Sequence, residues 1–431
     1  MKKTINYILL SAICLLGFSS CNNEDEAKFD ESSAQRLNEA VANYNKLLCS
    51  SEAGWAMEYF PTEDEQGYTF LMKFDKNTAV NIASKNEWTM NKMEQESSFF
   101  QMIADNGPVL SFNTYNSLFH YFSTPEDLPE TGEDNEDGRG HLGDYEFIVM
   151  NATDNEVTLR GKKRGVDIYL HRLPVGQDWG EYYAKLDNLE KSMFSSKIPS
   201  LILQAGGEKY TITNSAKHVM HFVPEGGDAI SQTTKMPFIV TEKGIRFVKP
   251  FTGDNDKFSI QTLNLTEEGV LVSENSEEDS KITAPAPATL ISEATWRFDK
   301  EKLGGKFVAA YANVVSESKA IFKTAFQYFE FKFDGKSSNN TLSFKNGKYN
   351  GMIYITIKDA GNNGSKISFS STGDGDNNGK VHLEKIPAYK AFLDLLTSTE
   401  YVATSKSAIM PSTIILTSVT DANDYVTIDI K

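Results

Sequence analysis

The segment of the chain that best matches a known chemical motif is Asp374-Gly-Asp376-Asn-Asn378-Gly379. Three side chains that carry oxygen stand at alternate positions before a glycine, as at the start of a calcium-binding loop. The match then ends, because Lys385 stands at the twelfth position, where such a loop has a bidentate glutamate. The same residue types form turns, and the flanking residues have the pattern of strands. We therefore expect a hairpin loop, with a calcium site on Asp374, Asp376 and Asn378 as the alternative.

A second candidate for metal chemistry is the pair His218 and His221, with Glu225 nearby. The flanking residues have the pattern of a strand, in which positions three apart face opposite sides of the sheet. A zinc site also needs further ligands, and the sequence has no HExxH pattern to supply them. We therefore expect ordinary sheet histidines and no metal here.

Motifs for catalysis are absent from the sequence. It contains no GxSxG nucleophile elbow and no phosphate-binding loop. With 59 acidic residues, a pair of catalytic carboxylates cannot be singled out, so a hydrolase stays open as an alternative. The sequence therefore predicts a protein without a cofactor that is not an enzyme.

Aromatic residues gather in one region, where Trp88 is followed by Phe112, Tyr115, Phe119, Tyr121 and Phe122. Exposed rings would form a surface on which a sugar ring or a peptide side chain packs. The alternation of strands would instead send many of the rings into a core, and aromatic residues are common in sheets. We expect most of them in the core and take Trp88, Tyr115 and Tyr121 as the candidate ligand-binding residues.

The first twenty-six residues have the pattern of a sorting signal. Two lysines precede an apolar run from Ile5 to Leu16, which is too short to span a bilayer as a helix. Two serines then form a small-residue cleavage site directly before Cys21. This order resembles a bacterial lipoprotein signal peptide. We therefore expect cleavage after residue 20 and lipidation of Cys21, whose acyl chains would anchor the protein to a membrane.

The charge argues against binding to nucleic acids, and the cysteines argue against a fold that depends on disulfides. The chain has 43 basic and 59 acidic residues and a net charge of -16, which opposes binding to the phosphates of nucleic acids. Of the three cysteines, Cys14 leaves with the signal and Cys21 is lipidated, so Cys49 has no partner for an intramolecular disulfide. We therefore expect no nucleic-acid partner and a fold that relies on a large core.

The other residues alternate between a few helices and many short strands. Helices are expected at residues 32–49, 178–194, 306–315 and 387–396, where apolar residues recur at the helical period. Short strands joined by turn residues occupy most of the rest, including one at Val381–Ile386. The short connections favour antiparallel pairing. The expected fold class is mainly β (α+β), with antiparallel sheets or barrel-like modules in series, a few short helices, and an N-terminal helix after the lipoprotein signal.

Changes in composition divide the chain into segments, most clearly where a charged stretch leads into a proline-rich one. The segments that we expect are a signal peptide at residues 1–20, a lipidated tether at 21–31, an N-terminal helix plus antiparallel β module at 32–176, a second β module with a leading helix at 177–273, a linker at 274–288 and a C-terminal β module with short helices at 289–431.

Several segments together carry a resemblance to a known family. The acidic tract Glu24-Asp25-Glu26 follows the lipidation site, and the strand-like segments 54–61, 67–74 and 157–165 come later. In these features the chain resembles a Bacteroidetes family of surface lipoproteins that is a domain of unknown function. The resemblance implies a location on the outer membrane, on the cell surface, near TonB-dependent nutrient importers. The family has no agreed catalytic residues, so the resemblance assigns no role to single positions.

Location and composition lead to one expected function with two alternatives. We expect a lipid-anchored, surface-exposed outer-membrane protein that binds an oligomeric nutrient, an oligopeptide or a glycan, as an accessory of an importer complex. The alternatives are a hydrolase that feeds the importer and a structural or adhesive surface protein. A pocket with converging ionisable groups would favour the hydrolase, and an open aromatic groove would favour the binding protein.

Overall fold

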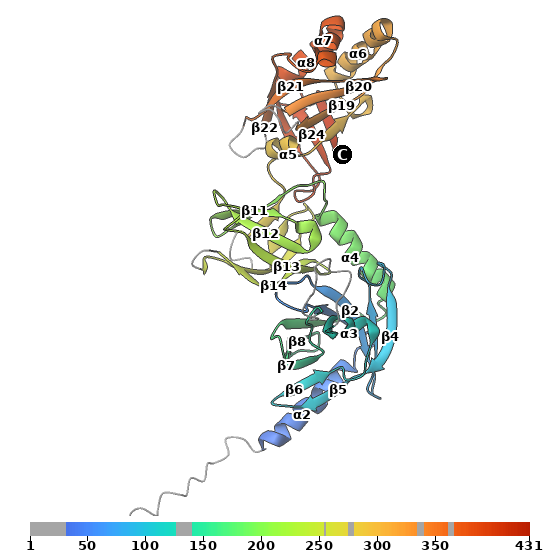
Figure 1. The fold of residues 1–431 in the computed structure, drawn as a ribbon, viewed down its shortest axis with the longest axis vertical. Coiled ribbons are helices and arrows are strands. Elements are labelled where there is room, and N and C mark those ends of the chain that lie inside the picture. Colours follow the sequence, from blue (N-terminus) through green and yellow to red (C-terminus); the bar gives the residue numbers. More distant parts are fainter. Residues whose placement is uncertain (1–31, 126–139, 254–255, 275–279, 334–339, 361–365) are drawn as a thin grey trace, which may run out of the picture.

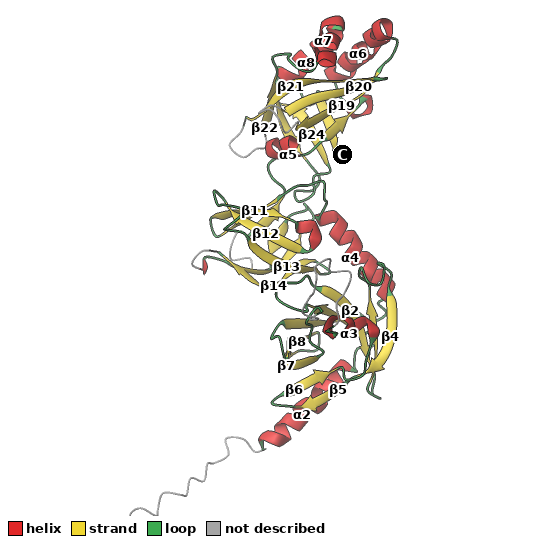
Figure 2. Ribbon diagram, viewed as in Figure 1, coloured by secondary structure: helices red, strands yellow, loops and turns green. Residues whose placement is uncertain are grey.

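The computed structural model describes residues 32–125, 140–253, 256–274, 280–333, 340–360 and 366–431, so the expected signal, acidic tract and lipidation site Cys21 lie outside the described residues. Figure 1 shows an elongated molecule in which three β modules follow one another in chain order, from the N-terminal module at the bottom to the C-terminal module at the top. Figure 2 shows that strands build each module. The expectation of a mainly β fold with antiparallel, barrel-like modules is confirmed.

The first module begins with helix α2, Ser33–Leu48, whose N-cap Ser32 accepts a hydrogen bond from the backbone N–H of Gln35 at 3.2 Å. Its further elements are β1 Trp55–Tyr59, β2 Tyr68–Phe74, β3 Ala79–Ser84, β4 Glu94–Phe99, β5 Gln101–Ala104, β6 Pro108–Ser111, α3 Ser117–His120, η1 Tyr121–Ser123, β7 Glu146–Ala152, β8 Glu156–Gly161 and β9 Asp167–Arg172. The order in the sheet is β4-β3-β2-β1-β9-β8-β7-β6-β5.

This sheet closes on itself through a bent segment. Phe100 alone separates β4 from β5, yet β4 pairs with β3 and β5 pairs with β6. Phe100 is fully buried, and its backbone N–H donates to the carbonyl of Thr78 at 2.9 Å, which holds the bend. Because β1 also pairs with β9, the module is an up-and-down barrel in which one strand is bent. The sequence analysis did not predict β4 or β5.

The second module is a closed barrel that follows helix α4, Trp179–Met193. Its elements are β10 Leu201–Ala205, β11 Glu208–Thr213, η3 Ser215–Lys217, β12 Val219–Pro224, β13 Thr234–Val240, β14 Gly244–Thr252, β15 Ser259–Leu265, β16 Leu271–Ser273 and β17 Lys281–Thr283. The strands pair in chain order, and β17 returns to β10. The linker expected at residues 274–288 is therefore wrong at β17, because the fully buried Ile282 makes this segment part of the barrel wall.

The third module is also a closed barrel. As in the second module, its strands pair in chain order, and the last strand returns to the first. Its elements are α5 Pro287–Glu293, β18 Trp296–Phe298, η5 Lys300–Lys302, α6 Lys306–Phe322, β19 Phe326–Phe333, β20 Asn340–Asn346, β21 Tyr349–Asp359, β22 Lys366–Ser370, α7 Asn377–Lys385, α8 Pro387–Thr397, β23 Glu400–Thr404, β24 Thr413–Ser418 and β25 Tyr425–Ile430. Helices α6, α7 and α8 gather at the distal end of this barrel in Figure 1. Phe392 of α8 stacks on Phe329 of β19, with ring centres 5.3 Å apart, so the helices extend the barrel core.

The strand expected at Val381–Ile386 is wrong, because these residues belong largely to helix α7. Val381 and Leu383 alternate with polar residues as in a strand. The helix forms instead because Asp376 caps it, accepting a hydrogen bond from the backbone N–H of Gly379 at 2.6 Å. His382 then stacks on Phe322 of α6, with ring centres 4.2 Å apart. The four helices expected from the sequence are confirmed as α2, α4, α6 and α8.

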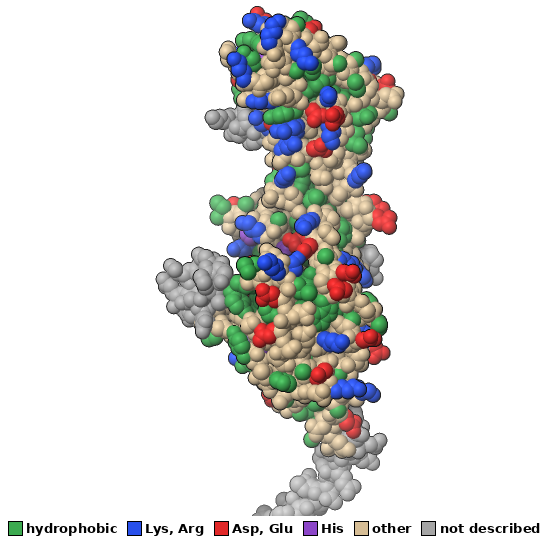
Figure 3. Space-filling view, turned by 90° about the vertical axis from the view of Figure 1, so that its right-hand side faces the viewer, with side chains coloured by type: hydrophobic (Ala, Val, Ile, Leu, Met, Phe, Trp, Pro, Cys, Tyr) green, Lys and Arg blue, Asp and Glu red, His purple; other side chains and the backbone are tan. Residues whose placement is uncertain are grey.

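The second and third barrels meet at a narrow joint, seen as a waist in Figure 3. The backbone N–H of Ala284 donates to the carbonyl of Ala408 at 2.8 Å, and that of Ile409 donates to the carbonyl of Gly269 at 2.7 Å. Acidic and basic side chains are interspersed over the face shown in Figure 3. Across the described part of the chain, we find no helix with the length and apolar character needed to cross a bilayer.

The first and second modules share a wider, packed interface. The backbone N–H of Gly67 donates to the carbonyl of Phe238 at 3.1 Å. Ile239 and Val248 of the second barrel pack into the core of the first module. Helix α4 belongs to the same interface, because the hydroxyl of Tyr183 lies 2.9 Å from the carbonyl oxygen of Thr69. These contacts place the two modules in one packed unit.

A buried cluster of charges lies within this interface. Glu58 of β1 has a side chain only 9% exposed, and it lies 2.6 Å from Nε of Arg246 in β14 and 3.1 Å from Nε2 of His171 in β9. The guanidinium of Arg246 also lies 4.3 Å from the centre of the Tyr169 ring. The other nitrogen of His171, Nδ1, lies 3.4 Å from the carboxylate of Glu156. The cluster therefore joins the two modules by charge.

The cluster shifts the ionisation of its members in favour of the charged forms. Burial acts to raise the pKa of Glu58, but His171 and Arg246 outweigh burial, and the pKa lies below its usual value. Burial acts to lower the pKa of His171, but Glu58 outweighs burial, and the pKa lies above its usual value. Both groups therefore stabilise the folded chain through their charges.

Replacing Glu58 with Gln should destabilise this interface strongly, because Arg246 would lose its carboxylate partner within the interface and His171 would keep only Glu156. Breaking a buried ion pair costs about 3–5 kcal/mol, and urea denaturation should show a loss of that order. The loss should be largest between about pH 4.5 and 6.5. The stability that His171 contributes is fully present below its usual pKa and is lost as pH rises through its raised pKa. The stability that Glu58 contributes is fully present above its usual pKa and is lost as pH falls through its lowered pKa.

Glu63→Gln is the matched control for this variant. Glu63 pairs with Lys249 across the same interface, but both side chains are about half exposed, so the change should have little effect on stability. Equal effects of the two substitutions would contradict a central role for the buried cluster.

Candidate functional site

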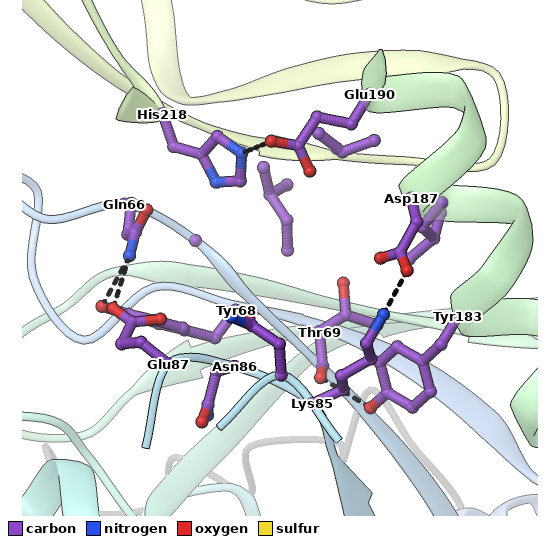
Figure 4. A pocket seen from close by; sticks show the side chains of 15 residues that line it. Gln66, Tyr68, Thr69, Lys85, Asn86, Glu87, Tyr183, Asp187, Glu190 and His218 are labelled. Carbon is purple, nitrogen blue, oxygen red and sulfur yellow. Dashed lines mark hydrogen bonds and ion pairs between the residues drawn. The ribbon is translucent and has the colours of Figure 1, made fainter. Parts of the chain in front are cut away.

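A polar pocket opens where the first module, helix α4 and the second barrel meet (Figure 4). It has a volume of about 210 Å³. The first module supplies residues around the start of β2 and the end of β3, and the second barrel supplies residues of β13 and the position before β12. The lining residues are Gln66, Gly67, Tyr68, Thr69, Lys85, Asn86, Glu87, Asn91, Tyr183, Leu186, Asp187, Glu190, His218, Ile239 and Val240.

Helix α4 directs two carboxylates toward the pocket. Asp187 and Glu190 are three positions apart, so they lie on one face of the helix. Asp187 forms an ion pair with Lys85 of the first module. Glu190 Oε1 lies 2.8 Å from Nε2 of His218 in the second barrel. The hydrogen bond with His218 lowers the pKa of Glu190 and outweighs the opposing effect of burial. The two pairs thus connect α4 to both modules.

His218 has a backbone conformation that is uncommon for its type. Its φ is +59°, in the left-handed region that residues other than glycine seldom adopt. The 3-10 turn η3 immediately precedes it, and its carbonyl accepts a hydrogen bond from the backbone N–H of Phe238 at 2.9 Å. Figure 4 shows the imidazole directed across the pocket to Glu190. Strained residues of this kind gather at functional sites, which makes His218 a candidate functional residue.

The wall opposite α4 presents amide and hydroxyl groups. The side-chain amide of Gln66 donates to Oε1 of Glu87 and to the hydroxyl oxygen of Tyr68, each at 3.1 Å. Tyr68 in turn donates from its hydroxyl to Oε1 of Glu65 at 2.8 Å. Burial raises the pKa of Tyr68, so its hydroxyl remains a proton donor. This wall therefore offers hydrogen-bonding groups that are themselves held in place.

The chemistry of the pocket follows from these groups. Lys85 and His218 are each paired with a carboxylate, and neither serine nor cysteine occurs among the described lining residues. The arrangement is suited to holding a polar ligand through several hydrogen bonds.

Of the three aromatic residues predicted to bind a ligand, two come together. The rings of Trp88 and Tyr121 lie 4.8 Å apart between their centres, and both side chains are partly exposed. Tyr115 is 66% exposed, and its ring instead contacts that of His120, with centres 5.5 Å apart. The neighbouring phenylalanines are buried in the core of the first module, as expected: Phe112, Phe119 and Phe122. Ligand binding by Trp88, Tyr115 and Tyr121 stays a prediction.

The residues of the calcium alternative bond to other parts of the protein. Asp376 caps α7, and Asn378 donates to the carbonyl of Asn350 at 2.8 Å. Asp374 forms an ion pair with Lys380 at 3.3 Å. Within the described ranges, no group of three or more His, Cys, Asp or Glu side chains is placed to hold a metal ion. All three side chains thus have partners in the protein, and calcium binding stays a prediction.

Sequence reasoning missed most of the pocket. Lys85 and Asp187 are 102 positions apart in the chain, and no motif or spacing connects them. His218 was expected to be an ordinary sheet histidine, but it precedes β12 and bonds to Glu190 of α4 instead. The expectation holds for His221, which lies within β12 and bonds to Asn214 at 3.1 Å. Only the turn residues around His218 could have signalled its position.

A family model described as "Domain of unknown function (DUF4302)" matches residues 25–266. No curated protein matches the chain. Among solved structures, the DNA polymerase III beta chain of Streptococcus pneumoniae TIGR4 is 12% identical, with 92% of this chain and 97% of that chain covered and a TM-score of 0.12. Isotype 1 transferrin binding protein B of serogroup B Neisseria meningitidis is 11% identical, with 87% and 69% covered and a TM-score of 0.14. TM-scores this low do not establish that the chain shares a fold with either protein.

Replacing Asp376 with Ala should lower the stability of the third barrel, because helix α7 loses its cap. Loss of an N-cap costs about 0.5–2 kcal/mol, and the fall in the thermal midpoint should be the same in calcium as in EDTA. Asn377→Ala, at the exposed next position, is the control and should leave the midpoint unchanged. A calcium-dependent rise in the wild-type midpoint that Asp376→Ala abolishes would instead establish the ion site.

Proposed function

The chain belongs to the family described as a domain of unknown function (DUF4302), and from this premise we propose that it is a lipid-anchored surface protein that binds one unit of an oligomeric nutrient without catalysis. The proposed site is the pocket between the first two modules. Every residue that lines the pocket falls within the matched range 25–266, so the pocket lies in the part of the chain that the family model describes.

The observation that carries this proposal is the pairing of charge across the pocket. Lys85 is bound to Asp187, and His218 is bound to Glu190. Groups that bond to each other hold the walls in position and leave oxygen and nitrogen atoms available for further hydrogen bonds. A neutral polar ligand would meet such walls without having to displace a counter-ion. Binding is therefore favoured over turnover at this site.

The size of the pocket supports an oligomeric ligand. Its volume of about 210 Å³ is below the roughly 300–1,000 Å³ of sites that enclose a whole small molecule. One sugar ring or one amino-acid side chain would fill it. The adjoining units of a glycan or an oligopeptide would then lie on the surface of the first module, beside the partly exposed rings of Trp88 and Tyr121.

The proposed location rests on the sequence alone. The lipidation signal at Cys21 and the acidic tract Glu24-Asp25-Glu26 support anchoring in the outer membrane of a Bacteroidetes cell, with the body on the outer surface. Residues 22–30 could extend about 30 Å, enough to hold the first module clear of the lipid head groups. There the protein would serve a TonB-dependent importer by capturing its nutrient.

Replacing Gln66 and Glu87 together with Ala should weaken ligand binding at least tenfold, because the wall opposite α4 loses its two outermost hydrogen-bonding groups. Soluble full-length chain lacking the signal would be screened against arrays of oligosaccharides and oligopeptides and then titrated by calorimetry. The double variant Asn81→Ala, Gln95→Ala is the matched control, because it removes an exposed cross-strand pair of the same module, 3.0 Å apart, outside the pocket.

Three results would contradict the proposal. Binding that the Gln66, Glu87 variant retains in full would place the ligand elsewhere. Reproducible cleavage of an array ligand that Glu190→Gln abolishes would make the protein a hydrolase. Absence of any ligand on either array would favour a structural or adhesive role.

Replacing Cys21 with Ala should abolish labelling by a palmitate analogue and release the chain into the soluble fraction, because acyl chains are the proposed anchor. Neutralising Glu24, Asp25 and Glu26 should keep the label but remove the chain from the reach of protease added to whole cells. A labelled Cys21→Ala variant would contradict the anchor, and unchanged protease access would contradict the role of the acidic tract.

A further inference from the structure

Three rings beside the pocket form a compact aromatic corner, made of Trp88, Tyr121 and His141. The ring of Trp88 lies 4.8 Å from that of His141, in an edge-on arrangement, and Tyr121 lies 5.5 Å from His141, measured between centres. The ring of Tyr68, whose residue also lines the pocket, lies 5.3 Å from Trp88. The aromatic corner and the pocket therefore share a wall.

Among the described residues, two ring nitrogens of the aromatic corner have no hydrogen-bond partner. They are Nε1 of Trp88 and Nε2 of His141, and both are covered by neighbouring atoms. The His141 side chain as a whole is only 5% exposed. A covered polar atom without a partner is unfavourable, so native proteins seldom leave two on adjoining rings. This arrangement points to a group that the free protein lacks.

The two nitrogens have opposite hydrogen-bonding roles. The indole Nε1 of Trp88 can only donate. His141 Nδ1 lies 2.6 Å from Oε1 of Glu65, a carboxylate oxygen that also accepts from the hydroxyl of Tyr68. The proton of a neutral His141 is thereby assigned to Nδ1, which leaves Nε2 as an acceptor. The corner therefore presents one donor and one acceptor on neighbouring rings.

A hydroxyl group satisfies both requirements at once, because one oxygen atom donates and accepts. A peptide unit serves them less well, since its N–H and C=O point to opposite sides of a rigid plane. The faces of Trp88 and Tyr121 offer flat apolar area of the kind on which a saccharide ring packs. Both side chains are partly exposed, so a ligand can approach the corner from solvent on that side.

We infer that the aromatic corner is a subsite for a carbohydrate, with a ring hydroxyl bonded to Trp88 Nε1 and His141 Nε2. This inference rests on the proposed function and narrows its ligand from an oligopeptide or glycan to a glycan. One sugar unit occupies the pocket, and a second unit lies at the corner. Both nitrogens are covered in the free protein, so the hydroxyl reaches them only after neighbouring atoms shift.

Trp88→Phe tests the inference, because it keeps an aromatic ring and removes only the indole N–H and part of the ring. Cellohexaose, maltohexaose, xylohexaose and mannohexaose would be titrated into the soluble full-length chain, alongside a lysine-containing hexapeptide. We expect at least one hexasaccharide to bind wild type and Trp88→Phe to weaken it by about three- to tenfold, as loss of one hydrogen bond does. The thermal midpoint of Trp88→Phe should fall less than that of Trp179→Phe, because both variants lose ring volume but only Trp179→Phe also breaks a hydrogen bond.

Trp179→Phe is the matched control. Trp179 is also partly exposed, but its Nε1 donates to the carbonyl of Ala53 at 2.8 Å. This variant should lower the thermal midpoint and leave hexasaccharide binding as in wild type. The pair of variants thus separates a nitrogen that serves the fold from one that serves a ligand.

The outcomes distinguish this inference from the proposed function. No binding of any hexasaccharide or of the peptide by wild type would overturn both. Hexasaccharide binding that Trp88→Phe leaves unchanged, or binding of the peptide alone, would overturn the carbohydrate subsite and leave the proposed function standing. A Trp88→Phe midpoint that falls as far as that of Trp179→Phe would show that the N–H is already paired in the free protein, which also overturns the subsite.

Discussion

Glu58 is buried, and a buried carboxylate must be paired to remain ionised. Its partners come from different parts of the chain: His171 from the neighbouring strand of the first module and Arg246 from the second barrel. Arg246 belongs to the other module, so its pairing with Glu58 requires the two modules to be in contact. The pair Glu58–Arg246 therefore acts together with the apolar contacts of Ile239 and Val248 to fix the second module against the first. Other features of this part of the molecule depend on that placement.

Helix α4 and the pocket are direct consequences. With the modules fixed, α4 spans both, bonding the first through Tyr183 and the second through Glu190. The space left between the helix, the first module and the second barrel is the pocket, in which Lys85 pairs with Asp187 and His218 bonds to Glu190. The pocket is thus a space between two modules in which polar groups remain available to a ligand. The aromatic corner adjoins this pocket through Tyr68.

The sequence predicted features that depend on neighbouring residues and missed those that depend on distant ones. Helices α2 and α4 were predicted because apolar residues recur at the helical period, and Trp88 and Tyr121 were noted because aromatic residues cluster locally. Val381–Ile386 was predicted as a strand, and the role of Asp376 as a helix cap was not recognised. The bend at Phe100 and the closing strand β17 depend on pairing with distant strands. Lys85, Asp187 and Glu190 carry no local signal, so their meeting could not be predicted without the packing of the modules.

Hydrogen exchange of the backbone amides, with and without the tightest-binding oligomer, tests the central claim most directly. If the pocket between the first two modules holds the ligand, exchange should slow at residues 66–69, 85–91 and 183–190. Exchange should stay unchanged around residues 405–412, where the second and third barrels meet. Slowing confined to the third barrel or to residues 405–412 would contradict the account.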